Sequence, residues 1–224
     1  MNALKSFLFV IPATILIFNC ICYSNQDLDE KLLEATISGD TKLVGQLIQK
    51  GADVNCTIEI QSLKYTPIAI ATSSGNIDMV KFLLKSGSKP EGSIEFPNLA
   101  FYLSITRNYP VIADELIKAG VDPNFAWDDE NGGTLLTNAA QFDNIEIVDL
   151  LVRNGADVNY TGSGKYSALY RSIIYDHPTV MMHLLKNGAK LNQNDKLALD
   201  SFGFFETKEF ENTVQILSNK GALN

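Results

Sequence analysis

The pentapeptide Gly51-Ala52-Asp53-Val54-Asn55 recurs through this chain of 224 residues. It returns unchanged as Gly155-Ala156-Asp157-Val158-Asn159, looser copies lie at 87–91, 120–124 and 188–192, and the chain stops inside a sixth copy at 221–224. The leading glycines are separated by 36, 33, 35, 33 and 33 residues. A fixed period of this length is typical of repeat proteins, in which each unit is one small supersecondary structure.

An apolar pair precedes each glycine. A leucine stands four positions before it and a Val, Ala or Met stands seven before it. This spacing puts both residues on one face of a helix. The glycine then ends the helix, because it alone enters the left-handed conformation without a Cβ penalty. The pairs are Val44 and Leu47, Val80 and Leu83, Ala113 and Leu116, Val148 and Leu151, Met181 and Leu184, and Val214 and Leu217.

A second, shorter helix is expected earlier in each unit. Thr66-Pro67-Ile68 offers a hydroxyl N-cap, a proline at the first helical position and then a core residue. Thr134 and Ser167 stand at the same place in later units. Small residues follow in the helix, where they let two helices approach closely: Ala71, Ser104, Ala139 and Ser172. Residues that tolerate turn conformations separate the two helices: Gly39, Gly75, Asn108, Asp143 and Asp176.

Together these positions resemble the ankyrin-repeat family. The resemblance is carried in one unit by Thr66-Pro67-Ile68, Ala71, Gly75, Val80, Leu83-Leu84 and Gly87, and in another by Ala35, Gly39, Val44, Leu47 and 51–55. It implies an all-α solenoid of stacked helix-turn-helix units joined by loops or β-hairpin fingers. The units are expected at about 27–56, 65–91, 98–124, 134–159, 167–192 and 196–224, in a domain that spans 25–224.

Two units depart from the pattern. The third has Leu99-Ala100-Phe101 in place of the Thr-Pro start. The sixth has Phe202 and Phe205 at the first-helix positions, and either Asp195 or Asp200 is the expected cap, with a first helix that is longer or displaced. Atypical units are expected at the ends of a solenoid, since one of their sides faces water.

Residues 1–24 lie outside the repeats and have the features of a secretory signal peptide. Lys5 is their only charge, and an apolar run from Phe7 to Phe18 is too short for a comfortable membrane span. We expect cleavage before Asn25 and a periplasmic or secreted location in a bacterium. Acylation at Cys20 as in a lipoprotein, or retention of the segment as an uncleaved anchor, would instead tether the protein to a membrane.

Charge and cysteine content narrow the classes of partner. The chain has a net charge of −8, which becomes −9 without Lys5. This balance disfavours nucleic acid and anionic membrane surfaces as partners. Cleavage before Asn25 leaves Cys56 as the single cysteine, so no intramolecular disulfide is expected.

Little in the sequence indicates catalysis or cofactor binding. The chain has two histidines, His177 and His183, and the nearby Ser172 occupies the small packing position of its helix. No spacing of His, Cys, Asp and Glu fits a metal site, and no glycine-rich loop fits a phosphate. We therefore expect no catalytic residue, no metal and no cofactor.

The expected functional surface is made of the fingers and the first helices. The fingers are expected at 57–65, 92–96, 125–133, 161–166 and 193–196, and several carry large aromatic residues, which are common at protein interfaces. Trp127, the only tryptophan, either contacts a partner or folds back over the neighbouring unit as a cover. The candidate partner-binding residues are Tyr65, Phe96, Tyr102, Phe125, Trp127, Asp128, Asp129, Glu130, Tyr166, Tyr170 and Arg171.

The sequence thus predicts a non-catalytic, monomeric protein-interaction module. A toxin-neutralising or enzyme-assisting role would fit a periplasmic location. The alternatives are a membrane-tethered structural adaptor and a small-molecule-binding protein or enzyme, which would need a closed polar pocket.

Overall fold

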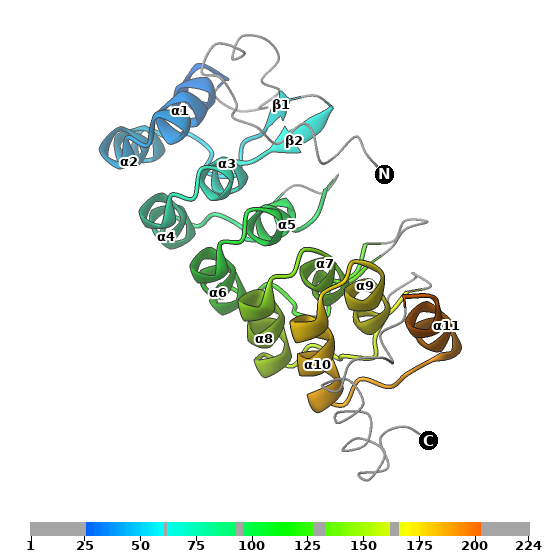
Figure 1. The fold of residues 1–224 in the computed structure, drawn as a ribbon. Coiled ribbons are helices and arrows are strands. Elements are labelled where there is room, and N and C mark those ends of the chain that lie inside the picture. Colours follow the sequence, from blue (N-terminus) through cyan, green and yellow to red (C-terminus); the bar gives the residue numbers. More distant parts are fainter. Residues whose placement is uncertain (1–25, 61, 93–95, 128–132, 162–165, 203–224) are drawn as a thin grey trace.

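The computed structural model describes residues 26–60, 62–92, 96–127, 133–161 and 166–202. In these residues the chain forms a stack of helix pairs with very little strand (Figure 1). The odd-numbered helices, here called first helices, form one row, and the even-numbered second helices form another. Each first helix contacts its own second helix and the first helices of the neighbouring units. The expected all-α ankyrin solenoid is confirmed.

The helices are short and regular. The first helices are α1 (Gln26–Ser38), α3 (Pro67–Ser73), α5 (Leu99–Thr106), α7 (Leu135–Gln141), α9 (Ala168–Ile174) and α11 (Gln193–Phe202). The second helices are α2 (Thr41–Gln49), α4 (Ile77–Lys85), α6 (Pro110–Lys118), α8 (Ile145–Arg153) and α10 (Pro178–Lys186). The first finger is an antiparallel hairpin of β1 (Ile58–Ile60) and β2 (Leu63–Tyr65), which lies on the side of the first helices (Figure 1).

The residues expected from the sequence at the ends of the helices are found there. The side-chain oxygens of Thr66, Thr134 and Ser167 accept hydrogen bonds from backbone N–H groups three residues later, which caps α3, α7 and α9. The glycine after each second helix has a positive φ, for example +101° at Gly51. The turn residues Asn108, Asp143 and Asp176 also have positive φ, and all three are types that tolerate it.

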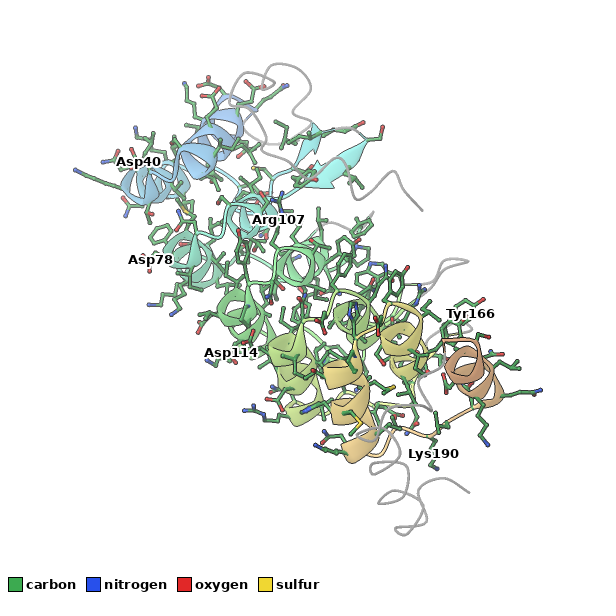
Figure 2. The ribbon with its side chains drawn as sticks, in the orientation of Figure 1. Asp40, Asp78, Arg107, Asp114, Tyr166 and Lys190 are labelled. Carbon is green, nitrogen blue, oxygen red and sulfur yellow. The ribbon has the colours of Figure 1, made fainter. Side chains whose placement is uncertain are left out.

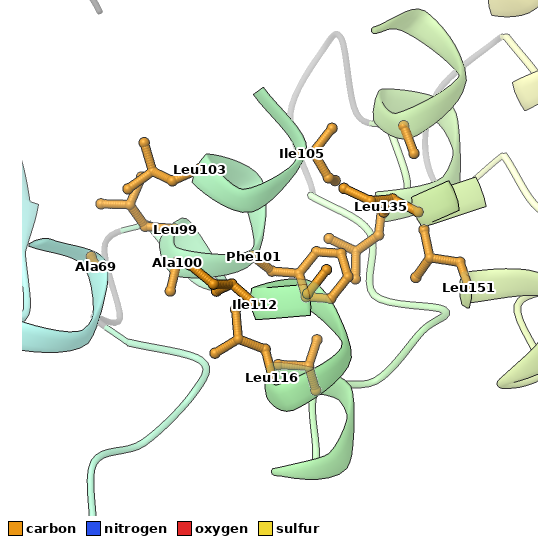
Figure 3. Packing of buried hydrophobic residues seen from close by; sticks show 14 of the residues in the cluster. Ala69, Leu99, Ala100, Phe101, Leu103, Ile105, Ile112, Leu116, Leu135 and Leu151 are labelled. Atoms are coloured by element: carbon orange, nitrogen blue, oxygen red, sulfur yellow. The ribbon is translucent and has the colours of Figure 1, made fainter. Parts of the chain in front are cut away.

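The core is a continuous row of apolar side chains at the predicted positions. The leucines and their partners seven positions before each glycine are at most 4% exposed wherever the structure describes them. Figure 3 shows the centre of the row, where Phe101, Ile105 and Leu116 pack between neighbouring units. The small residues Ala71, Ser104, Ala139 and Ser172 are fully buried, as expected for close helix approach.

A row of asparagine side chains joins successive units across their loops. The amide N–H of each asparagine side chain donates to the carbonyl of the next unit's glycine. The side-chain oxygen of the same asparagine accepts from the backbone N–H two residues after that glycine, and we call each such pair of bonds a rung. The rungs are Asn55 to Gly87 (3.3 Å) and Lys89 (2.8 Å), Asn124 to Gly155 (3.0 Å) and Asp157 (2.8 Å), and Asn159 to Gly188 (3.1 Å) and Lys190 (2.8 Å). Glu91 occupies this place in the second unit, and a carboxylate has no amide N–H to donate.

A second row of links lies at the turns between helices. The Asn144 amide donates to the carbonyl of Ile105 in the preceding unit. The ring Nε2 of His177 is hydrogen-bonded to the carbonyl of Gln141, again one unit back, at 3.0 Å. These contacts explain why polar residues occupy the N-cap positions of α8 and α10 without capping their own helices.

The sixth unit differs from the sequence-based expectation. We expected a finger at 193–196 and a cap at Asp195 or Asp200, but α11 begins at Gln193, directly after the loop of the fifth unit. Asn192 is the cap: its side-chain oxygen accepts from the N–H of Asp195, and the Asp195 carboxylate accepts from the N–H of Asn192. This reciprocal pair is a capping box, so the helix starts where the finger was expected.

Some expectations lie outside the described residues. These are the signal peptide at 1–24 with Cys20, the finger residues 128–130, and the second helix of the sixth unit. Within the part of the chain that the structure describes, no helix is long and apolar enough to cross a membrane.

We predict that Asn124→Ala lowers the free energy of unfolding by about 1–3 kcal/mol, because it leaves the Gly155 carbonyl and the Asp157 N–H without their partner. Asn154→Ala is the matched control. Its amide bonds the carbonyl of Leu150 in its own helix, so the expected loss is below about 0.5 kcal/mol. Urea denaturation of both variants measures the difference, and equal losses would show that the rungs do not stabilise the stack.

Candidate functional site

Charge is distributed unevenly between the two rows of helices. The four central first helices, α3, α5, α7 and α9, contain one charged residue between them, Arg171. The second helices α4, α6 and α8 carry the acids Asp78, Asp114, Glu115, Glu146 and Asp149. Figure 2 shows Asp40, Asp78 and Asp114 along the edge of the second helices and Tyr166 on the opposite side, near α11. Depletion of charged residues is a property of interface cores, so the first-helix face is the candidate site.

Four of the predicted residues form one aromatic cluster. The centroid of the Trp127 ring lies 5.0 Å from the ring centroid of Phe125, 5.9 Å from that of Tyr102 and 6.2 Å from that of Phe96. Phe96 and Tyr102 also meet edge to face at 5.9 Å. These residues come from two fingers and from α5, so the cluster joins the third unit to the fingers on both sides. We call it the central aromatic cluster.

Trp127 is anchored within this cluster. Its indole N–H donates to the carbonyl of Pro97 at 3.1 Å, and its backbone N–H donates to the carbonyl of Gly133 at 3.1 Å. The ring is partly buried against the core. The tryptophan therefore folds back over the adjacent unit, which was one of the two roles expected for it. Binding through the remaining exposed part of the cluster stays a prediction.

Tyr65 lies at the end of β2, half buried. Burial raises the pKa of its phenol, and the nearby positive charge of Arg107 opposes that rise. The Nε atom of Arg107 is buried and has no hydrogen-bond partner among the described residues. Burial likewise raises the pKa of Tyr102. Both phenols are therefore neutral hydrogen-bonding groups at physiological pH.

The other predicted residues form a second cluster on the C-terminal side. Tyr166 and Tyr170 stack at 4.4 Å with an interplanar angle of 16°, and the guanidinium of Arg171 lies 5.6 Å from the centre of the Tyr166 ring. The two tyrosines line a groove of about 270 Å³ between α9 and α11, together with Ile174 and Leu197. We call this the C-terminal groove.

The acidic residues expected beside Trp127, namely Asp128, Asp129 and Glu130, lie outside the described residues. The structure thus brings together seven of the candidates in two clusters and places Tyr65 beside Arg107. Sequence reasoning missed Leu197 and Ala198 of the C-terminal groove, because their helix was expected to begin later. The Asn192/Asp195 spacing was the signal that could have located them.

Ser172 and His183, the residues considered above for catalysis, belong to neither cluster. The Ser172 hydroxyl donates to the Leu169 carbonyl at 2.7 Å and is buried. Burial, and then the charges of Arg153 and Lys186, lower the pKa of His183, which lies 3.4 Å from an Asp149 oxygen. Among the described residues, no cluster of His, Cys, Asp and Glu could hold a metal ion.

A larger groove of about 570 Å³ lies on the other row, between α4 and α6. Lys81, Lys85 and Lys118 line it together with Glu115. The Glu115 carboxylate lies 3.8 Å from the ammonium of Lys81 and 3.4 Å from that of Lys118, so two of the three ammonium groups share one carboxylate.

Comparison with known proteins agrees with this architecture. A family model described as "Ankyrin repeats (3 copies)" matches residues 15–94, 32–126 and 99–195. The chain is 30% identical over 171 residues to the ankyrin repeat and KH domain-containing protein mask-1 of Caenorhabditis elegans, a match that covers 74% of this chain and 6% of that protein. It is 28% identical over 176 residues to the ankyrin repeat protein nuc-2 of Neurospora crassa (76% and 16% covered).

A third relative is the palmitoyltransferase AKR1 of Lachancea kluyveri, which is 28% identical over 161 residues, with 71% of this chain and 22% of that protein covered. The chain therefore spans less than a quarter of the length of each of these three relatives. The similarity extends over the repeats and leaves most of each relative unmatched.

We predict that Trp127→Ala lowers the free energy of unfolding by about 2 kcal/mol, because it removes a partly buried aromatic side chain and its bond to Pro97. Tyr160→Ala, at a tyrosine that is 43% exposed, is the control and should change it by less than about 0.5 kcal/mol. Urea denaturation followed by circular dichroism measures the free energy of unfolding of both variants. An unchanged midpoint for Trp127→Ala would mean that the ring is not a structural cover.

Asp195, which lies at the start of α11 beside the C-terminal groove, makes the free energy of unfolding depend on pH. Its carboxylate is buried and accepts from the Ser167 hydroxyl at 2.9 Å and from the Asn192 N–H at 2.8 Å. Burial raises the pKa of Asp195 above its usual 3.8, although both hydrogen bonds oppose the rise. The folded state then holds this proton more tightly than the unfolded state, so the contribution of Asp195 to stability falls as pH rises above about 4.

We predict that Asp195→Asn removes this dependence. The stability of the variant relative to the wild type should rise between pH 4 and pH 6, as measured by urea denaturation at each pH. Asp78→Asn, at an exposed carboxylate, controls for the loss of one negative charge. A relative stability that falls over this range would contradict the prediction.

Proposed function

Because this chain belongs to the ankyrin-repeat family, we propose that it is a non-catalytic protein that binds a protein partner through its first helices and fingers. Ankyrin repeats generally mediate protein–protein interaction. The observation that carries the proposal for this face is the near absence of charge on α3, α5, α7 and α9 in a chain with a net charge of −8. The aromatic residues of the central aromatic cluster and of the C-terminal groove offer apolar contacts on this face. Arg171, and Arg107 directly after α5, offer polar ones.

A rigid stack supports this mode of binding. The Asn rungs and the turn contacts hold neighbouring units in register, so the face is already formed before a partner arrives. Little ordering entropy then opposes association. The central aromatic cluster and the C-terminal groove both consist of residue types that are enriched at interface hot spots.

The proposal includes export and a monomeric state. The charge and apolar run of residues 1–24 favour cleavage before Asn25, and a periplasmic or secreted protein could neutralise a toxin or assist an enzyme. Membrane tethering, by retention of this segment or by acylation at Cys20, is the alternative location. The similarity to a palmitoyltransferase covers 22% of that protein, and the Ser172 hydroxyl is buried and bonded within its own helix, which leaves us no reason to propose catalysis.

The test is capture of the partner by tagged full-length chain expressed in its host. We compare the wild type with two triple variants, each of which removes two acids and one exposed apolar or aromatic side chain. The surface variant is Asp128→Ser, Asp129→Ser and Tyr166→Ala, and the control on the second helices is Asp78→Ser, Glu146→Ser and Leu43→Ala. The surface variant should reduce recovery of a stoichiometric partner at least about tenfold, which is a loss of about 1.4 kcal/mol, and the control should retain it.

Equal recovery with both variants would overturn the assignment of the face. The intact mass of the same purified chain tests export: residues 25–224 indicate cleavage, the full mass indicates retention, and an added acyl mass on a chain beginning at Cys20 indicates a lipoprotein.

A further inference from the structure

We infer that the C-terminal groove binds an acidic peptide segment of the partner, with an apolar side chain in the groove and a neighbouring carboxylate on Arg171. This inference rests on the proposed function, since it names the chemistry that the first-helix face would recognise. It concerns one part of that face, at α9 and α11, so it can fail while the proposed function stands.

The shape and lining of the groove suit a side chain. Tyr166, Tyr170 and Ile174 form one wall, and α11 forms the other with Leu197 and Ala198 and with the polar residues Asn194 and Ser201. Leu197 is 57% exposed and Tyr166 is 40% exposed, so both side chains are accessible to a ligand from solvent. The volume of about 270 Å³ lies below the range of roughly 300–1,000 Å³ typical of small-molecule sites. The groove therefore fits part of a peptide better than a whole cofactor.

The tyrosine wall is already ordered. The centroids of the two rings are 4.4 Å apart, and the ring planes are nearly parallel, with an angle of 16°. Tyr170 lies in the first turn of α9, and its backbone N–H donates to the side chain of Ser167, which caps the helix. The opposite wall is fixed by the Ser167–Asp195 hydrogen bond, which ties α9 to the start of α11. An apolar side chain that enters the groove would thus lose its contact with water without requiring the site to rearrange.

Arg171 supplies the positive charge that the carboxylate of the peptide would contact. Its guanidinium lies over the Tyr166 ring at 5.6 Å, and no described carboxylate lies within ion-pair distance of it. Asp195, the acid at the start of α11, is engaged by Ser167 and Asn192 instead. Arg153 is different, because it forms an ion pair with Asp149 on α8. A guanidinium held by an aromatic face keeps donors in a planar fork that matches a carboxylate.

The surroundings favour an acidic peptide over other anions. Of the two first helices next to α9, α7 carries no acid that would repel a carboxylate. On the other side α11 carries Asp200 and Asp195, and the Asp195 carboxylate is bonded by Ser167 and Asn192. A nucleic acid would meet the net charge of −8 of the whole chain with a dense row of phosphates, whereas a short acidic segment meets mainly the local positive charge of Arg171. The apolar groove next to Arg171 then selects a segment that combines a carboxylate with a large apolar side chain.

The test is a titration of the isotope-labelled full chain with three capped peptides, followed by NMR. The probe is acetyl-Asp-Phe-Glu-Leu-Asp-amide, its neutral counterpart is acetyl-Asn-Phe-Gln-Leu-Asn-amide, and its polar counterpart is acetyl-Asp-Ser-Glu-Ser-Asp-amide. We expect shifts of the amide signals of Tyr170, Ile174 and Ala198 with the probe. Its affinity should exceed that of each counterpart roughly tenfold, since each lacks one of the two contacts.

Two arginine variants make the test specific. Arg171→Gln should bring the probe and the neutral peptide to the same affinity, whereas Arg153→Gln should preserve their difference, because Arg153 lies on a second helix. Equal affinities in the wild type, no binding, or shifts confined to the central aromatic cluster would each overturn this inference. A wild-type chain that captures a protein partner but binds the three peptides equally would overturn this inference and leave the proposed function standing.

Discussion

The structure depends on the contact between neighbouring first helices. A helix of seven or eight residues cannot bury its apolar side chains alone, and α5 buries Phe101, Leu103 and Ile105 only because α3 and α7 lie on either side of it. Small residues make this approach possible. Ser104, Ala139 and Ser172 are fully buried at the same helical position, and a larger side chain there would push adjacent units apart.

Close stacking also determines what the rest of the chain can do. Because the first helices are buried on three sides, their remaining exposed positions and the fingers form the face that we propose as the binding surface. The absence of acids from α3, α5, α7 and α9 is compatible with packing alone at the buried positions. Packing does not require the exposed Tyr166, nor Arg171, which has no ion pair with a described carboxylate. Among the helices of the central units, the acids lie on the second helices, where several pair with lysines and arginines of the same row.

Much of the fold could be predicted because its signals are local. The Thr66 cap, the positive φ at Asp143 and the burial of Leu151 each follow from a residue and its near neighbours. The start of α11 was missed because we carried the period of the earlier units over to the last one, whereas Asn192 and Asp195 cap the helix at once. Of the candidate site, the residue types were predicted, but their grouping into two clusters depends on finger conformations that have no local signal.

The sequence by itself determined the period of the repeats, the ends of most helices and the positions that form the core, because caps, glycines and apolar spacing act within one or two turns of chain. The tertiary structure decided the rest. It made Asn124 a link between units, turned Trp127 onto Pro97 and placed Tyr170 opposite Leu197. Each of these contacts joins residues roughly thirty positions apart, so it exists only once neighbouring units have stacked.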